Sequence, residues 1–436
     1  MLSIKLIREQ SEYIQEIYKK RNYNFPINQV LELDEKKRRL IFDLDKLRSI
    51  RKKSSKQINP SMNENEKKTV IDSQKETSTK IHELEDLLRN IENKLTQLLL
   101  EMPNILQDDI HEGGEKEAKI ILQGIGNEIL EDKKERTIAD KPSKSEYNKV
   151  PGHWDIAKQL GMIDFERGVK ISGQRFYVLM KDGAKLQRSL INWMLEEHTE
   201  RGYSEIYPPV LVKEEMLVGT AQLPKFGENL YRDIEEDLWL IPTAEVPVTN
   251  LYREEILSND SIPIKHVAYT PCFRREKMSA GKEVRGIKRG HQFDKVELVN
   301  FVAPLDSAAA HEQLLQDSLN IVKQLGLRYR VLLLASQDTS FASSKTYDIE
   351  VWSPGSEEWL EVSSVSNFLD FQTRRANIRY KDTKGNNIFL HTLNASGLAL
   401  PRTLAALIEQ NFIDNSIIIP DVLQPFMKKT IIKQSY

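Results

Sequence analysis

The sequence predicts an α+β protein in two parts: an N-terminal antiparallel coiled-coil hairpin of α-helices, and a domain built on an antiparallel β-sheet flanked by helices. Two observations support this fold class. An apolar seam with the three-and-four spacing of a coiled coil runs through the first quarter of the chain. After Pro151 the pattern changes to runs of alternating apolar and polar residues with helical stretches between them, which is typical of such a sheet.

The second helix of the predicted hairpin carries the clearest seam. Its members are Ile81, Leu84, Leu88, Ile91, Leu95, Leu98 and Met102. In the first helix, Leu33, Leu40 and Leu47 recur every seven residues, and residues 57–68 lack an apolar period, which predicts the turn. Pro103 should end the second helix. Helices joined by so short a turn run antiparallel, which gives an arm about 40 Å long at 1.5 Å per residue.

Basic residues crowd the far end of this arm. They are Lys46, Arg48, Arg51, Lys52, Lys53 and Lys56, with Lys67 and Lys68 across the turn. No acidic residue lies among the first six, and such a tip suits a phosphate backbone because neutralised phosphates release counterions. The alternative is a dimerisation or spacer coiled coil whose charged end is merely solvated.

Composition restricts the class of protein. A chain of 436 residues is long for one compact core, and it has no apolar run near the ~20 residues needed to span a bilayer. The N-terminus lacks the features of a secretory signal, so we expect a cytoplasmic protein without a membrane segment. The single Cys272 excludes an internal disulfide and a multi-cysteine zinc site, and is interpreted as a small buried residue. The net charge of −2 means that any contact with a polyanion must come from a local patch.

We predict three segments: an arm over 1–112, a linker over 113–150 and the sheet domain over 151–436. The linker has glycines and mixed charges, and its short apolar stretch at 120–122 predicts one edge strand. Strands are expected near 205–212, 266–275, 292–303, 329–335, 347–352 and 358–366, and helices near 184–198, 305–325 and from about 402. Because no GxGxxG or GxxxxGK[ST] motif occurs, neither a Rossmann nor a P-loop nucleotide site is supported.

One strand–loop–strand segment carries charges that could hold a nucleotide without a glycine-rich loop. Phe273-Arg274-Arg275-Glu276 ends one predicted strand, and HQFDKVELV (291–299) forms the next. Guanidinium groups suit phosphate because they stay charged and donate bidentate hydrogen bonds. On spacing alone, a surface salt bridge is the alternative interpretation of so short a motif.

FRRE and the following RGIKRGHQFDKVE resemble motif 2 of class II aminoacyl-tRNA synthetases, and in this extended form they resemble the seryl-tRNA synthetases. Three further blocks agree in order and spacing. They are LIPTAEVPVTNLY (240–252), WLEVSSVSNFLDFQTRRANIRY (359–380) and LNASGLALPRTLAALIEQ (393–410), the last being similar to motif 3. GYSEIYPPVLV (202–212) has the proline-containing look of motif 1, which implies a homodimer. The resemblance covers nearly the whole chain and implies that the sheet domain is a class II catalytic domain.

The resemblance implies an enzyme that activates L-serine with ATP and transfers it to the 3′ end of a serine tRNA. It leaves open whether a selenocysteine tRNA is also charged. Arg274 would contact the α-phosphate and the serine carboxylate, and Arg402 the γ-phosphate, as the two catalytic residues. The implied ATP-binding residues are Arg274, Arg275, Glu276, Phe293, Glu361, Val362, Ser363, Ser364 and Arg402.

Within that set, Glu276 would accept from the adenine amino group. Phe293 would stack on the adenine ring, with a role in the strand core as the alternative. Glu361 and Ser364 are the implied ligands of Mg²⁺, a hard cation that prefers oxygen, and they would need phosphate oxygens to complete the site.

The implied serine-binding residues are Thr243, Ala244, Glu245, Arg274, Glu297 and Ser396. A buried group that pairs with the serine hydroxyl would reject alanine, because the analogue leaves that group unpaired. Two departures from the family pattern concern motif 3, where Ala395 and Pro401 stand in place of glycines. Pro401 suits the first turn of a helix, but a shifted backbone would displace Arg402. In the motif 2 loop, Lys277 and Met278 could alter contacts with the tRNA acceptor end.

Three other functions remain as alternatives. A catalytically inactive homologue acting as an RNA-binding protein is disfavoured because the implied catalytic and substrate residues are all retained. An aminoacyl ligase that loads a carrier protein would not need a basic-tipped hairpin. A cytoskeletal coiled-coil protein explains only residues 30–102.

Overall fold

The computed structural model describes residues 1–57, 63–130, 137–142, 150–277 and 285–434. The chain divides into two compact units, Met1–Pro103 and Asn104–Tyr436. None of the helices in the described residues is long and apolar enough to cross a membrane.

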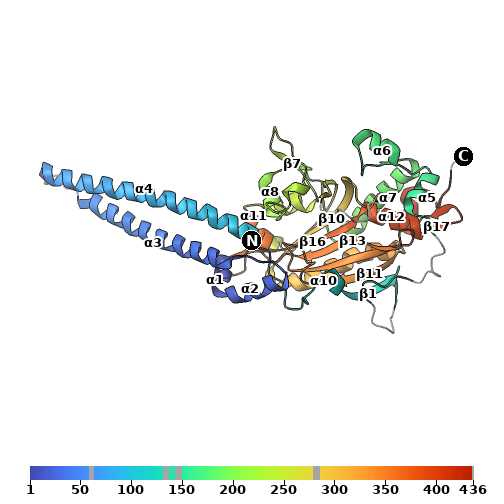
Figure 1. Ribbon diagram of the computed structural model, residues 1–436, viewed down its shortest axis with the longest axis horizontal. Coiled ribbons are helices and arrows are strands. Elements are labelled where there is room, and N and C mark those ends of the chain that lie inside the picture. The colour runs from blue at the N-terminus through green and yellow to red at the C-terminus, as the bar shows by residue number, and fades with distance from the viewer. Residues whose placement is uncertain (58–62, 131–136, 143–149, 278–284, 435–436) are drawn as a thin grey trace. The chain divides into compact units, whose positions relative to one another are not determined.

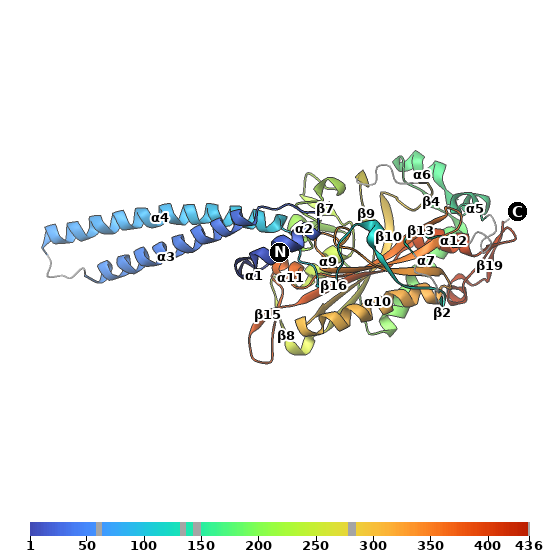
Figure 2. The ribbon, with the colours of Figure 1, turned by 60° about the horizontal axis from the view of Figure 1, so that its bottom comes forward.

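The first unit contains the predicted helical hairpin, whose two long helices run side by side in Figures 1 and 2. Its elements are α1 (Ile4–Glu9), α2 (Ser11–Lys20), α3 (Ile27–Gln57) and α4 (Glu64–Glu101). At 1.5 Å per residue, α3 is about 46 Å long, somewhat longer than expected. Pro103 follows the end of α4, which confirms the predicted stop.

The predicted seam is buried in α4 and only partly in α3. In α4, Ile81, Ile91 and Leu95 are buried. In α3, Leu44 is buried, whereas the predicted Leu33, Leu40 and Leu47 are half-buried. Near the base, Leu99 is buried in place of the predicted Leu98, which is half-buried. The drift follows from helix geometry, because 3.6 residues per turn do not match a strict seven-residue repeat.

The predicted turn over 57–68 was too long. Residues 58–62 lie outside the described residues, but α4 already begins at Glu64, so residues 64–68 are helical. Their sequence ENEKK contains neither proline nor glycine, and Glu and Lys are good helix formers. The absence of an apolar period therefore marked a solvated helix end, not a loop.

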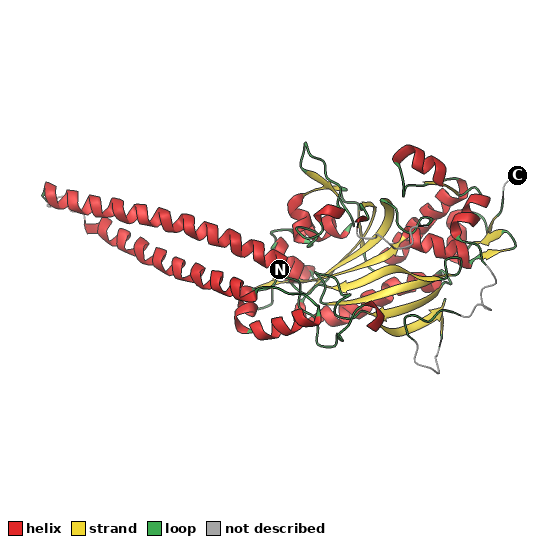
Figure 3. Ribbon diagram, viewed as in Figure 1, coloured by secondary structure: helices red, strands yellow, loops and turns green. Residues whose placement is uncertain are grey.

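The second unit is organised around a nine-stranded sheet, drawn in yellow in Figure 3. Its strands in spatial order are β2 (Glu128–Ile129), β1 (Lys119–Ile125), β11 (Arg328–Leu333), β12 (Lys345–Ser353), β13 (Glu358–Asn367), β16 (His391–Ala399), β10 (Gln292–Val302), β9 (Ile264–Phe273) and β5 (Ser204–Ile206). Neighbouring strands are antiparallel except β5 and β9, which are parallel.

The main core lies between this sheet and three long helices, α7 (Lys181–Glu200), α10 (Ser307–Gln324) and α12 (Leu400–Gln410). On β10, Val296 and Leu298 point into this core. The alternate residues Phe293, Lys295 and Glu297 therefore face the opposite side of the sheet.

Smaller elements complete the unit. The helices are α5 (His153–Gln159), α6 (Phe165–Ser172), α8 (Glu214–Gly219), α9 (Glu245–Thr249), α11 (Phe371–Ala376) and α13 (Gln424–Met427). The strands are β3 (Ile163–Asp164), β4 (Val178–Leu179), β6 (Leu211–Lys213), β7 (Leu238–Leu240), β8 (Ile256–Ser258), β14 (Arg379–Lys381), β15 (Asn387–Phe389), β17 (Phe412–Ile413), β18 (Ser416–Ile418) and β19 (Ile431–Ile432).

Most predicted strands and helices of this unit occur within a few residues of their expected bounds, with two exceptions. The strand expected at 205–212 is split into β5 and β6, because Pro208 and Pro209 lack the N–H groups that a continuous strand needs. Strand β16, which lies between β13 and β10, was not predicted. Its residues 392–396 do alternate between polar and apolar, but the segment HTLNASGLA is rich in Asn, Gly and Ala, which are depleted in strands.

The segment predicted as a linker contributes to the sheet. The expected edge strand is β1, with the two-residue β2 outside it. Just before this segment, Asn104 is buried and its side-chain amide donates to the carbonyl oxygens of Ala342 and Phe368 at 2.9 and 2.8 Å. Residues 104–112 thus pack with the second unit, whereas the predicted arm extended to residue 112.

Candidate active site

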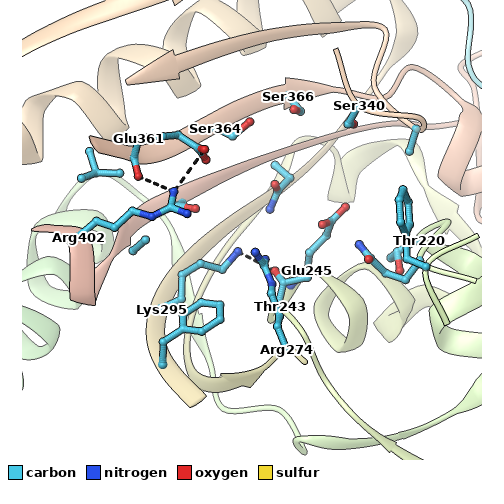
Figure 4. Close-up of a pocket in the computed structure, with 18 of the residues that line it drawn as sticks. Thr220, Thr243, Glu245, Arg274, Lys295, Ser340, Glu361, Ser364, Ser366 and Arg402 are labelled. Atoms are coloured by element: carbon cyan, nitrogen blue, oxygen red, sulfur yellow. Dashed lines mark hydrogen bonds and ion pairs between the residues drawn. The ribbon is translucent and has the colours of Figure 1, made fainter. Parts of the chain in front are cut away.

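A cavity of about 280 Å³ opens on the face of the sheet to which Phe293 and Lys295 point (Figure 4). Segments far apart in the sequence line it, from Thr220 to Arg402. The predicted site residues in its wall are Thr243, Glu245, Arg274, Glu276, Phe293, Glu361, Val362, Ser364, Ser396 and Arg402. The fold therefore brings charged residues from four of the five motif-like blocks to one place, and only the motif 1-like segment 202–212 contributes none to the described wall.

A β-bulge explains why Glu361 and Ser364 face the cavity together. On β13, Glu361 pairs with Glu350 and Ser363 pairs with Ile349, so Val362 is an extra residue with no partner. An extra residue reverses the alternation of side chains, which puts positions 361 and 364 on the same side. Ser363 consequently faces away, and its hydroxyl donates to the carbonyl oxygen of Ser396 at 2.7 Å.

Arg274 and Arg275 point to opposite sides, as successive residues of an extended chain do. The Arg274 side chain donates from Nε to the carbonyl oxygen of Pro242 at 3.2 Å, and its guanidinium lies 5.1 Å from the Phe293 ring centroid. Arg275 donates to the Leu230 carbonyl oxygen at 2.8 Å. Arg274 thus lines the cavity, whereas Arg275 does not.

Two ion pairs hold charged side chains of the cavity wall in place. Arg402 donates to the carbonyl oxygen of Glu361 at 2.8 Å and lies 3.3 Å from its carboxylate, as the dashed lines in Figure 4 show. Glu276 pairs with Arg289 at 3.5 Å. Pro401 occupies the first turn of α12 as expected, and Arg402 still faces the cavity.

Ala395, the other residue that stands in place of a glycine in the motif 3-like block, does not project its side chain into the cavity. Ala395 pairs with Leu298 across the sheet and lies in the core with the helices, so its methyl group points away from Ser396.

A buried polar cluster forms the middle of the cavity. Thr243 donates to Glu297 at 3.2 Å and accepts from Lys295 Nζ at 2.8 Å, and Lys295 also forms an ion pair with Glu297. Asn394 donates to the second carboxylate oxygen of Glu297. Glu297 lies just behind the cavity wall, with 1% of its surface exposed, so its negative charge is held by protein donors.

The predicted residue Ala244 lies beside this cluster but not in the cavity wall. Its side chain packs in an apolar cluster with Val248 and Ala268. It therefore contributes to the position of the backbone between Thr243 and Glu245.

Glu245 is the carboxyl group most perturbed in this middle part. Burial, followed by the nearby charge of Glu297, raises its pKa to about 7. Gln372 opposes the shift by donating from Nε2 to Glu245 at 2.6 Å, and Thr392 in turn donates to the Gln372 carbonyl oxygen at 2.7 Å. The orientation of the Gln372 amide is thus determined by two partners.

Sequence reasoning missed several residues of the site. They are Lys295, Lys288 and Arg289 in the cavity wall, Asn394 beside Glu297, and Gln372 behind Glu245. Lys295 could have been found, because it lies two positions from both Phe293 and Glu297 on one strand face. Gln372 has no such local signal.

Oxygen donors suited to a hard cation occur at one end of the cavity. Glu361 and Ser364 line the wall, and Asp348 pairs with Ser364 across the sheet. Burial and the neighbouring Glu361 raise the pKa of Asp348 well above its usual range. In the described chain no group of three or more His, Cys, Asp or Glu is arranged to hold a metal ion. Mg²⁺ would fit here only with additional oxygens from bound phosphates.

Cys272 is fully buried, as expected, and burial raises the pKa of its thiol. The thiolate form that a nucleophile requires is therefore disfavoured.

The basic residues at the far end of the hairpin include one, Arg48, that forms an ion pair with the other helix. Arg48 on α3 binds Glu85 on α4 at 2.8 Å and lowers the pKa of that carboxyl. The other five members on α3, Lys46, Arg51, Lys52, Lys53 and Lys56, are exposed, and in the described part of the arm none has an ion-pair partner. Across the turn, Lys68 is exposed and Lys67 is half-buried. These five charges on α3 are available to a polyanion.

Comparison with known proteins agrees with this fold and cavity. Residues 228–411 match the family model of the tRNA synthetase class II core domain for G, H, P, S and T. Residues 1–106 match the seryl-tRNA synthetase N-terminal domain. Together with the antiparallel sheet, these matches define a class II aminoacyl-tRNA synthetase.

Full-length relatives identify the family within this class. The chain is 48% identical to the serine–tRNA ligase of Thermomicrobium roseum, over 98% of this chain and 93% of the relative. It is 47% identical to that of Dehalococcoides mccartyi, over 99% and 100%. The crystal structure of seryl-tRNA synthetase from Pyrococcus horikoshii complexed with ATP superposes with a TM-score of 0.87 at 30% identity, and both chains are covered completely. The chain belongs to the serine–tRNA ligase family.

Proposed function

We propose that this protein activates L-serine with ATP and transfers it to the 3′ end of a serine tRNA. The observation that carries this proposal is one cavity that combines two arginines, Arg274 and Arg402, with a buried cluster around Glu245 and Glu297. The cations suit a triphosphate, and the carboxylates suit an ammonium group beside a small hydroxyl. The relatives' names and the ATP-bound neighbour support the same substrates.

In the first step a serine carboxylate oxygen attacks the α-phosphorus, the bond to the β-phosphate oxygen breaks, and pyrophosphate leaves with the electron pair. Arg274 would neutralise the charge on the α-phosphate during this displacement. Arg402 would hold the γ-phosphate, which requires it to exchange its contact with Glu361 for the phosphate. Glu276 would accept from adenine and Phe293 would stack on it.

Glu361 and Ser364 would hold Mg²⁺ together with phosphate oxygens, and the ion would offset the charge of the triphosphate. In the second step a ribose hydroxyl of the tRNA attacks the seryl carbonyl and AMP leaves.

Serine binding would use the middle of the cavity. Thr243, Glu245 and Ser396 are the proposed contacts, with Arg274 at the carboxylate. Glu297, the fourth residue implied by the resemblance, lies behind the wall and would act through Thr243 and Lys295. Lys295 compensates the charge of Glu297, so the ammonium group of serine would compensate Glu245. Arg275, Ala244 and Ser363 would act through the positions of their neighbours, because their side chains do not line the cavity.

Pyrophosphate exchange measured with each of the twenty amino acids tests the activity. We expect exchange with serine alone, and charging of serine tRNA in a parallel assay. Exchange without tRNA charging would favour the ligase that loads a carrier protein, and no exchange would favour an inactive RNA-binding homologue.

The raised pKa of Glu245 predicts a pH dependence of serine binding. An ammonium group binds the ionised carboxylate, so the serine KM should rise as pH falls through about 7. From pH 8 to pH 6 we expect about a tenfold increase, since one unit below its pKa about one carboxyl in ten is ionised. Gln372→Met should move this rise to higher pH, because the amide stabilises the ionised form. A serine KM that stays flat in both proteins, measured beside the ATP KM as a control, would contradict the assignment.

We also propose a cytoplasmic homodimer. In the motif 1-like segment, Tyr207 and Leu211 are 89% and 45% exposed beside the sheet's edge strand β5, and a partner subunit would cover them. Light scattering should then report twice the 50.5 kDa mass of one chain. Whether a selenocysteine tRNA is a second substrate would follow from charging assays with that tRNA.

A further inference from the structure

A fully buried histidine and glutamate lie outside the cavity and have no role in the proposed chemistry. His153, the first residue of α5, and Glu409, near the end of α12, both have side chains with 0% exposure. His153 Nδ1 lies 2.8 Å from Glu409 Oε1, and the backbone N–H of His153 donates to the same oxygen at 2.9 Å. Burial of a carboxylate is costly unless hydrogen-bond donors surround it, and these two contacts supply donors to one oxygen of Glu409.

The second oxygen of Glu409 joins a third segment. It accepts from the hydroxyl of Ser353 and from the backbone N–H of Gly355 at 3.0 Å. Both residues lie at the turn that connects β12 to β13, and β13 carries Glu361 and Ser364. Glu409 thus holds α5, α12 and this turn together.

The other ring nitrogen of His153 reaches the segment that follows the motif 2 loop. The backbone N–H of Ile287 donates to His153 Nε2 at 3.2 Å. Because Nε2 accepts, the ring proton is on Nδ1 and is donated to Glu409. The ring therefore has one defined tautomer and connects Glu409 to the backbone of Ile287.

Ile287 directly precedes two cations of the cavity wall. Lys288 and Arg289 both line the cavity, and Arg289 pairs with Glu276, the proposed acceptor for the adenine amino group. The backbone approaches His153 very closely here, because a Cβ added to Gly286 would lie 2.0 Å from Nε2. The backbone at Gly286 and Ile287 is therefore packed directly against the His153 ring, just before the two cavity residues Lys288 and Arg289.

We propose that His153 is a positioning residue for ATP: Glu409 fixes its ring, and its Nε2 fixes Ile287 and thereby sets Lys288 and Arg289 at the nucleotide end of the cavity. The inference rests on the proposed function, since it takes this end of the cavity as the ATP site. Among the described residues, the hydrogen bonds of Thr243, Glu245 and Glu297 do not involve His153, Glu409 or Ile287. Removal of the link should therefore weaken ATP binding and leave serine binding unchanged.

Two substitutions separate the two links of the ring. In His153→Asn the amide nitrogen can replace Nδ1 and donate to Glu409, but nothing accepts from Ile287. In His153→Gln the amide oxygen can replace Nε2 and accept from Ile287, but the link to Glu409 is absent. We expect His153→Asn to raise the ATP KM in pyrophosphate exchange about fivefold, the factor that one ordinary hydrogen bond is worth. His153→Gln should stay closer to the wild-type ATP KM, with the serine KM unchanged in both.

A glycine pair gives a test that does not alter the buried residues. Gly286→Ala should displace Ile287 from His153 and raise the ATP KM as His153→Asn does. Gly385→Ala is its matched control, because Gly385 has nearly the same φ, +84° against +81°, but open space where the Cβ would be. This pair decides the question even if the histidine variants do not fold.

Calorimetric titration with ATP and without serine gives the same comparison without turnover. Equal ATP affinities in Gly286→Ala and Gly385→Ala, a wild-type ATP KM in His153→Asn, or a parallel rise in the serine KM would overturn the positioning role. Absence of serine-dependent exchange in the wild-type protein would instead overturn the proposed function, and the calorimetric comparison would still test His153.

Discussion

Arg274→Ala should abolish serine-dependent pyrophosphate exchange, with a decrease of about a thousandfold in kcat, as is typical when one preorganised donor to a developing charge is removed. The guanidinium of Arg274 lies against the Phe293 ring. Its Nε donates to the carbonyl oxygen of Pro242, which directly precedes Thr243 in the chain. Both proposed substrates meet there. Arg274→Lys should not restore exchange, because an ammonium group cannot reproduce the bidentate fork of a guanidinium.

Arg275→Ala is the matched control for this decrease. It removes the same side chain from the adjacent position, but that side chain is directed to Leu230 and Tyr231 outside the cavity wall. We expect a much smaller change in exchange, and melting temperatures of the two variants should show whether either decrease reflects unfolding. Wild-type exchange in Arg274→Ala, or equal decreases in both variants, would contradict the proposed role of Arg274.

Replacement of residues 36–100 by a short Gly/Ser linker should eliminate tRNA charging and preserve serine-dependent exchange. All the residues that line the cavity lie between Thr220 and Arg402, whereas the helical hairpin belongs to a separate compact unit. Serine and ATP are small enough to bind within the cavity, but a tRNA can contact both units. By family resemblance, serine tRNAs are recognised by the shape of a long variable arm, through ionic backbone contacts.

Neutralising Arg51, Lys52, Lys53 and Lys56 together should be a milder version of the same change. These residues are exposed, whereas Arg48 is omitted because it stabilises the hairpin through Glu85. We expect a higher tRNA KM and a shallower salt dependence, by up to about 0.9 in log–log slope for each phosphate that the tip no longer neutralises. The serine KM should not change.

The control removes equal charge from the second unit, at four exposed lysines, Lys170, Lys381, Lys384 and Lys433. If this control weakens tRNA charging as much as the tip variant, the effect comes from net charge. If the enzyme without residues 36–100 charges tRNA normally, the hairpin is only a spacer.

The sequence by itself determined most of the helices and strands, and it determined which side of β10 faces the cavity. The hairpin follows from apolar spacing, and that spacing identified Ile81, Ile91 and Leu95 on the buried side of α4. On β10 side chains alternate between the two faces of the sheet, so Phe293, Lys295 and Glu297 lie on the same face. These features depend on residues close together in the chain, whose geometry the backbone repeats impose.

Only the tertiary structure decided which groups meet across the sheet and how their charges combine. The partner of Glu245 is Gln372, 127 residues away, and the partner of His153 is Glu409, 256 residues away. The bulge at Val362 depends on register with β12, so the strand's own alternation could not bring Glu361 and Ser364 together. Pairings of this kind arise from packing between segments, and neither segment alone carries a period that encodes the other.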